Sequence, residues 1–229
     1  MPKIIQPTYI TKQPSTGKQV KFRPFTVKEE KSLLLALQEN NIETTTEAIK
    51  NVISACTDGQ INPDVTPYYD IEYIYLQIRA KSVGELIDLV GSCECGTDKK
   101  TEFSVDISDA KIEPAPSGNA IIKIADTPYT IEFRHPSIDD FAKMFHSVDA
   151  NAEQVVANCI VKVFDDDEVL NWSFDEKLEF VESMSTKQQK GAADFLRDMP
   201  MCKLASKYTC RACDKEHNTI LSGYESFFI

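Results

Sequence analysis

The segments Cys93-Glu94-Cys95-Gly96 and Cys210-Arg211-Ala212-Cys213 place two pairs of closely spaced cysteines far apart in one chain. Each pair lies between two short runs that alternate apolar and polar residues in the manner of β-strands. A cysteine pair in a tight turn supplies two of the four ligands of a tetrahedral zinc ion. Together the two pairs therefore predict one zinc site that ties the middle of the chain to its end.

Other interpretations of the cysteines are plain thiols or a redox pair. A thioredoxin-type Cys-x-x-Cys opens a helix after a strand, whereas residues 214–218 lead from Cys213 into another strand, which opposes a redox role. His217 is an alternative ligand, although a solvated loop histidine is the simpler interpretation. The predicted zinc ligands are Cys93, Cys95, Cys210 and Cys213. Four thiolates leave no open position for substrate, so the site would be structural.

Composition excludes several classes of protein. The chain has 229 residues, of which 42% are hydrophobic and 27% charged, as in ordinary globular proteins. A net charge of -11 opposes binding to the nucleic-acid backbone, which requires clustered Lys and Arg. We expect no transmembrane helix and no signal peptide, because no long apolar run exists. In a cytosol, the seven cysteines are thiols or metal ligands rather than disulfides.

A repeated order of elements predicts an internal duplication. Residues 20–26 and 129–137 each alternate like a half-buried strand, reach an arginine close to a proline, and then begin a helix. A hairpin signal precedes each of them, with turns at 14–17 and 125–128. The helix starts carry capping-box patterns, Thr26 with Glu29 and, in a weaker form, Ser137 with Asp140.

Three helices are expected to follow in each half, and residues 185–199 add one more to the second half. The second helix of the second half is expected to carry an apolar stripe at helical spacing, formed by Val156, Cys159, Ile160 and Val163. Its counterpart in the first half includes Cys56, so Cys56 and Cys159 are interpreted as core residues.

We therefore predict an α+β fold with two pseudo-repeated halves, each a β-hairpin, a small helical bundle and a zinc-knuckle hairpin. The first half is 1–113 and carries Cys93 and Cys95; the second is 119–229 and carries Cys210 and Cys213. Residues 114–118, Pro-Ala-Pro-Ser-Gly, have the composition of a linker. The zinc ion would hold the two halves together.

No catalytic motif stands out in the sequence. The three histidines lack a recognisable catalytic context, and phosphate-binding or metalloprotease motifs are missing. The run Asp165-Asp166-Asp167-Glu168 leaves a metal-dependent enzyme as an alternative. Consecutive carboxylates without the alternating spacing of a calcium loop are usually a solvated loop, so we predict a protein that is not an enzyme.

Several segments carry a resemblance to a known family. They are the strand end Arg23-Pro24-Phe25, the acidic Glu29-Glu30 before a Leu-rich helix, the two cysteine knuckles, and the ending with Gly223, Phe227 and Phe228. Over most of its length, the chain resembles the baseplate hub assembly proteins of T-even-type contractile-tailed bacteriophages.

The resemblance implies a late, non-enzymatic phage protein of tail assembly. It would be a component of the baseplate hub, or a chaperone for hub and tape-measure proteins, which would be its partners. It would be found in the host cytoplasm during assembly, or in the tail baseplate of the virion. The alternative from the cysteines is a zinc-ribbon protein that binds nucleic acid or the transcription machinery, which the acidic charge opposes. The aromatic tail at 223–229 either packs into the core or docks on a partner.

Overall fold

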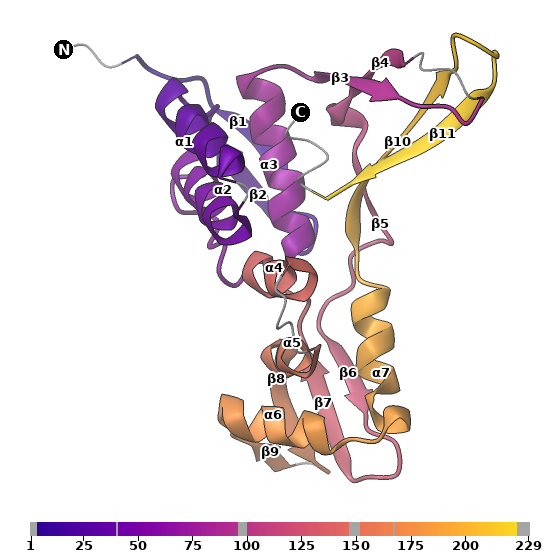
Figure 1. The fold of residues 1–229 in the computed structure, drawn as a ribbon. Coiled ribbons are helices and arrows are strands. Elements are labelled where there is room, and N and C mark those ends of the chain that lie inside the picture. The colour runs from indigo at the N-terminus through magenta and orange to yellow at the C-terminus, as the bar shows by residue number, and fades with distance from the viewer. Residues whose placement is uncertain (1–3, 40, 96–99, 147–151, 167, 224–229) are drawn as a thin grey trace.

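The computed structural model describes residues 4–39, 41–95, 100–146, 152–166 and 168–223. The described chain forms, in order, β1 (Tyr9–Lys12), β2 (Gln19–Phe22), α1 (Val27–Gln38), α2 (Ile42–Cys56), α3 (Tyr68–Ser82), β3 (Leu86–Gly91), β4 (Thr101–Asp106), β5 (Lys111–Glu113), β6 (Ala120–Lys123), β7 (Tyr129–Phe133), α4 (Ile138–His146), α5 (Ala152–Cys159), β8 (Ile160–Asp165), β9 (Glu168–Leu170), α6 (Phe174–Ser183), α7 (Thr186–Arg197), β10 (Met201–Thr209) and β11 (Glu216–Ser222) (Figure 1). This mixture of helices and antiparallel strands confirms the α+β class.

The strands form four small antiparallel sheets, with orders β1-β2, β3-β4, β11-β10-β5 and β6-β7-β8-β9. Three hydrophobic clusters hold them. The first lies among β1, β2 and the helices α1, α2, α3 and α4. The second lies among β6, β7, β8 and the helices α5, α6 and α7. The third joins α3 to β3, β4 and β10. The chain therefore passes from α7, which packs in the second cluster, into the long strand β10, which packs in the third (Figure 1).

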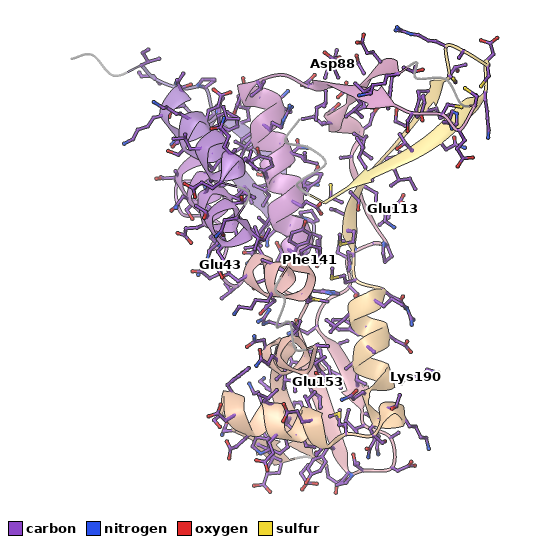
Figure 2. The ribbon with its side chains drawn as sticks, viewed as in Figure 1. Glu43, Asp88, Glu113, Phe141, Glu153 and Lys190 are labelled. Atoms are coloured by element: carbon purple, nitrogen blue, oxygen red, sulfur yellow. The ribbon has the colours of Figure 1, made fainter. Side chains whose placement is uncertain are left out.

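Helix α3 is the element that most of the structure surrounds. Eleven of its fifteen residues are buried; five of them lie in the first cluster and two in the third. Its first residue, Tyr68, stacks on Phe141 of α4 with ring centroids 3.8 Å apart (Figure 2). A helix enclosed in this way must satisfy its polar side chains within the protein.

Two buried carboxylates on α3 fix other parts of the chain. Asp70 accepts hydrogen bonds from the Gln13 amide (2.7 Å), the Ser15 backbone N–H (2.9 Å) and the Ser15 hydroxyl, which anchors the turn between β1 and β2. Glu72 accepts a hydrogen bond from the backbone N–H of Cys202 in β10 at 3.1 Å and another from the Tyr68 hydroxyl at 3.4 Å. Burial raises the pKa of both carboxyl groups, that of Glu72 to about 7.

The helix starts after β2 and β7 have similar contacts. Thr26 caps α1 in a capping box with Glu29, as predicted, and the Arg23 guanidinium donates to both Glu29 oxygens at 2.7 and 2.9 Å. This ion pair lowers the pKa of Glu29 to about 2. In the turn between β7 and α4, Asp140 accepts a hydrogen bond from Arg134 at 2.8 Å and another from the Ser137 hydroxyl, also at 2.8 Å.

The arginines of these two turns are also tied to the following helices in the same manner. The backbone N–H of Arg23 donates to the Cys56 carbonyl at 2.9 Å, and that of Arg134 to the Cys159 carbonyl at 2.9 Å. Both cysteines are buried, as predicted, and desolvation raises the pKa of each thiol to about 12.

One predicted helix is wrong in its second half. Helix α5 ends at Cys159, and Ile160–Asp165 forms β8, which pairs with β7. The sequence Ile-Val-Lys-Val-Phe is rich in β-branched residues, which lose little freedom in a strand, and β7 offers it an open edge. The acidic run then connects β8 to β9, with Asp167 outside the described residues.

Residues 114–118 connect β5 to β6, and β5 pairs with β10 from the other side of this proposed linker. The division into halves at 114–118 stays a prediction. The additional helix expected at 185–199 is confirmed as α7.

We predict that Glu72→Gln removes a pH-dependent loss of stability. Folded Glu72 holds its proton up to pH of about 7, whereas an unfolded glutamate releases it near 4.5. The folded state is therefore favoured by Glu72 below pH 4.5, and this contribution is lost as the pH rises through about 7. Glutamine does not ionise, so the variant escapes this loss. Its free energy of unfolding relative to the wild type should therefore increase by roughly 2–4 kcal/mol as the pH rises from 4.5 to about 7.

Urea unfolding at a series of pH values measures this difference. Glu182→Gln is the control, because Glu182 is exposed on α6 and water solvates its charge in the folded chain. A difference between Glu72→Gln and wild type that stays constant from pH 4.5 to 8 would contradict the prediction.

Candidate metal centre

The structure brings all four predicted cysteines together. Cys93 and Cys95 lie in the connection between β3 and β4, and Cys210 and Cys213 lie in the turn between β10 and β11. The four Sγ atoms lie within 4.8 Å of one another. Cys93 Sγ is 3.7 Å from Cys213 Sγ, and Cys95 Sγ is 3.9 Å from Cys210 Sγ.

These separations suit a metal ion better than disulfides. A disulfide requires a sulfur–sulfur distance of about 2.05 Å. In a tetrahedron with metal–sulfur bonds of about 2.3 Å, the sulfur atoms are separated by about 3.8 Å. Four thiolates are soft donors, which suit zinc or another thiophilic metal. The four cysteines can therefore hold a metal ion.

The turn from Cys210 to Lys215 is shaped by its own backbone. The Cys210 N–H donates to the Lys215 carbonyl at 2.9 Å, and the Asp214 N–H donates to the Cys210 carbonyl at 3.0 Å. Asp214 has a φ of 56°, a left-handed conformation that Asp tolerates better than most residues. This turn places Cys210 and Cys213 on the same side, facing the cysteines of the other hairpin.

The thiols influence each other's ionisation. The backbone N–H groups of Ala212 and Cys213 lower the pKa of Cys210, and that of Ala212 lies 3.4 Å from its sulfur. The pKa of Cys213 is raised to about 12: a hydrogen bond from Lys215 opposes the rise, but desolvation and the nearby thiols, Cys210 first, outweigh it. Neighbouring thiolates repel one another, and a bound cation would remove this opposition.

A stack of aromatic rings lies next to the cysteines. Tyr208 lies between Phe103 and His217, with ring centroids at 4.7 and 4.9 Å. Its hydroxyl donates to the Ser92 carbonyl, next to Cys93. A Cβ on Gly91 would lie 2.5 Å from the Tyr208 ring, so this close packing requires glycine at position 91.

His217 is not a solvated loop residue, so that interpretation of the sequence was wrong. It lies in β11, half-buried, and its Nε2 is 3.1 Å from Cys93 Sγ. Position 217 is half-buried because side chains alternate along β11, and Tyr208 opposite it supplies a ring to stack on. Metal-bound thiolates commonly receive such hydrogen bonds from a surrounding shell.

In the part of the chain that the structure describes, the other candidate features do not form a second cluster of ligands. Within the described residues, the four cysteines are the one group of three or more metal-ligating side chains that converge. None of the described helices has both the length and the apolar character needed to cross a membrane. Gly96 and the aromatic residues Tyr224, Phe227 and Phe228 lie outside the described residues.

We predict that Gly91→Ala destabilises the chain by roughly 1–3 kcal/mol, because the new methyl group overlaps the Tyr208 ring. Gly118→Ala is the control, since nothing lies within 4 Å of a Cβ built there. Urea midpoints measure both. The double variant with Tyr208→Leu should recover part of the loss; equal stabilities of Gly91→Ala and wild type would refute the proposed packing.

Comparison with known proteins supplies the family. A family model described as T4 bacteriophage base plate protein matches residues 6–229, a range that includes both cysteine pairs. Searches of curated proteins and of solved structures returned no match. The chain therefore belongs to the family of the T4 bacteriophage base plate protein.

Proposed function

We propose that this protein is a component or an assembly chaperone of the central hub of the phage tail baseplate, and that one structural zinc ion stabilises it. The observation that carries the zinc proposal is the convergence of four sulfur atoms from two hairpins at the separations of a tetrahedral site. Membership of the family supports a structural tail protein without enzymatic activity. Its partners would be hub and tape-measure proteins, in the host cytoplasm during assembly or in the virion tail.

The proposed zinc ion would act as a cross-link. Cys95 and Cys210 are separated by 115 residues, so joining their turns removes much of the freedom of the unfolded chain. By analogy with a disulfide that closes a loop of this length, the contribution to stability is about 4–5 kcal/mol. Because four thiolates complete the coordination, the ion would hold the two hairpins and would present no open position to a substrate.

We also propose that the chain arose by internal duplication. Two turns support this, because in each a strand leads to an arginine that binds a capping carboxylate and donates its backbone N–H to a buried cysteine carbonyl. In this scheme the two cysteine pairs occupy corresponding positions of the copies, and the metal ion joins one copy to the other.

The purified protein is expected to contain about one zinc ion per chain by elemental analysis. Cys213→Ser should lose most of this zinc and lower Tm by roughly 10–15 °C, as should a strong chelator. Cys56→Ala is the control, because Cys56 lies in the core formed by α1, α2 and α3 and should leave the zinc content unchanged. A metal-free wild-type chain with full thermal stability would rule out the zinc proposal.

The role in the hub predicts a stable complex with other tail proteins. Co-expression of the chain with the hub and tape-measure proteins of the same phage, followed by size-exclusion chromatography, should give a shared peak of defined stoichiometry. Co-expression with a tail-sheath protein is the specificity control. If the chain elutes alone in every combination with hub and tape-measure proteins, the proposed role is wrong.

A further inference from the structure

A long groove runs between α1 and α2 on the side away from α3. Its volume is about 760 Å³. The α1 residues in its wall recur every three or four positions, as one face of a helix does, and so do those of α2. It extends from Thr26 to Glu39 along α1 and from Thr44 to Ala55 along α2. At about 1.5 Å per residue, this is about 20 Å along α1 and about 17 Å along α2, or three to four helical turns.

The floor of the groove is apolar and built from small side chains. Ala36 and Val52 are buried at its base, Ala48 is half-buried, and Ala55 is exposed at one end. Leu35 on the rim is 51% exposed. Small residues at these positions allow another backbone to approach closely, and an exposed leucine beside them gains stability if it is covered. The groove thus has the shape and the chemistry that receive a helix.

Charge identifies the kind of helix that would fit. A second, smaller hollow lies on the other side of α2, against α4, and shares Glu47 with the groove. The two hollows are lined by five carboxylates and two lysines: Glu29, Glu39, Glu43, Glu47 and Asp139, with Lys28 and Lys143. Arg23 pairs with Glu29, and Lys50 is shared among Glu47, Asp64 and Asp139, so an excess of carboxylates remains after these ion pairs are counted. Glu43 lies at the start of α2 on the outer side of the molecule (Figure 2). A helix with basic residues beside its apolar stripe would complement this rim.

We propose that the groove between α1 and α2 binds an amphipathic helix of another tail protein, with small or branched apolar residues facing the floor and Lys or Arg facing Glu39 and Glu47. This inference rests on the proposed role in the hub and specifies how a partner is held. Among the described residues, no salt bridge involves Glu39, so its charge is available to a partner. Glu47 has only a long contact of 3.8 Å with Lys50, which Lys50 shares with Asp64 and Asp139. Three to four turns of the partner helix would be covered.

The experiment uses the intact chain and overlapping 20-residue peptides that span the hub and tape-measure proteins of the same phage. We expect the bound peptides to be basic amphipathic helices. Ala55→Trp fills one end of the groove and should weaken their binding, measured by fluorescence anisotropy, at least tenfold. The matched control is Ala193→Trp, at an exposed alanine of α7, which should change binding less than twofold.

A second pair of variants tests the charges. Glu39→Lys combined with Glu47→Lys should weaken binding about tenfold at low salt, and the difference should shrink as salt is raised. Glu179→Lys combined with Glu182→Lys, two exposed positions on α6, is the control. Circular dichroism shows whether each variant keeps the helical content of the wild type.

Three outcomes would overturn the groove proposal. In the first, no peptide binds, or the bound peptides lack a basic amphipathic pattern. In the second, Ala55→Trp binds as tightly as the wild type. In the third, the chain forms a dimer in sedimentation experiments that Ala55→Trp dissociates, so that the occupant is a second copy. If co-expression still gives a complex, the role in the hub stands and only the binding surface is wrong.

Discussion

The enclosure of α3 constrains the rest of the structure. A helix with eleven buried residues has almost no exposed side, so its Asp70 and Glu72 carboxylates cannot be solvated. The chain satisfies them with the Gln13–Ser15 turn on one side and the backbone of β10 on the other. Because an unpaired buried carboxylate is very costly, these contacts specify where the first hairpin and the final strands must lie.

The position of the four cysteines follows from the same constraint. Glu72 and β5 hold β10 at its start, while Leu204 and Cys202 pack in the cluster with α3. The far end of β10 is thereby directed toward the connection between β3 and β4 (Figure 1). There, Tyr208 stacks on Phe103 and donates a hydrogen bond to the Ser92 carbonyl. These contacts between the two hairpins help to bring the four sulfur atoms together.

The parts of the fold that could be predicted from the sequence are those with local signals. The turn at 14–17, the capping box of Thr26 with Glu29, and the spacing of both cysteine pairs each depend on a few neighbouring residues, and the structure contains all three. The strand character of Ile160–Asp165 was missed because apolar residues at 156, 159, 160 and 163 also fit a helix, and pairing with β7 decided the outcome. The role of Gly91 could not be found, because it depends on Tyr208, which is distant in sequence. His217 was considered only as an alternative ligand, because its stacking on Tyr208 depends on the register of β10 and β11.

The distribution of tight and open packing separates two tasks within one chain. The cysteine centre, the aromatic stack and the carboxylates of α3 all join segments that are distant in sequence, so they use their chemistry to stabilise the chain itself. Helices α1 and α2 bury one side against α3 and leave the other, with its apolar floor and glutamate rim, without a covering element among the described residues. A structural protein needs a rigid frame and also a surface that is not buried by the packing of that frame. Here the frame lies along α3 and β10, and the uncovered surface lies on the opposite side of the first helical pair, where the proposed partner helix would bind away from the four cysteines.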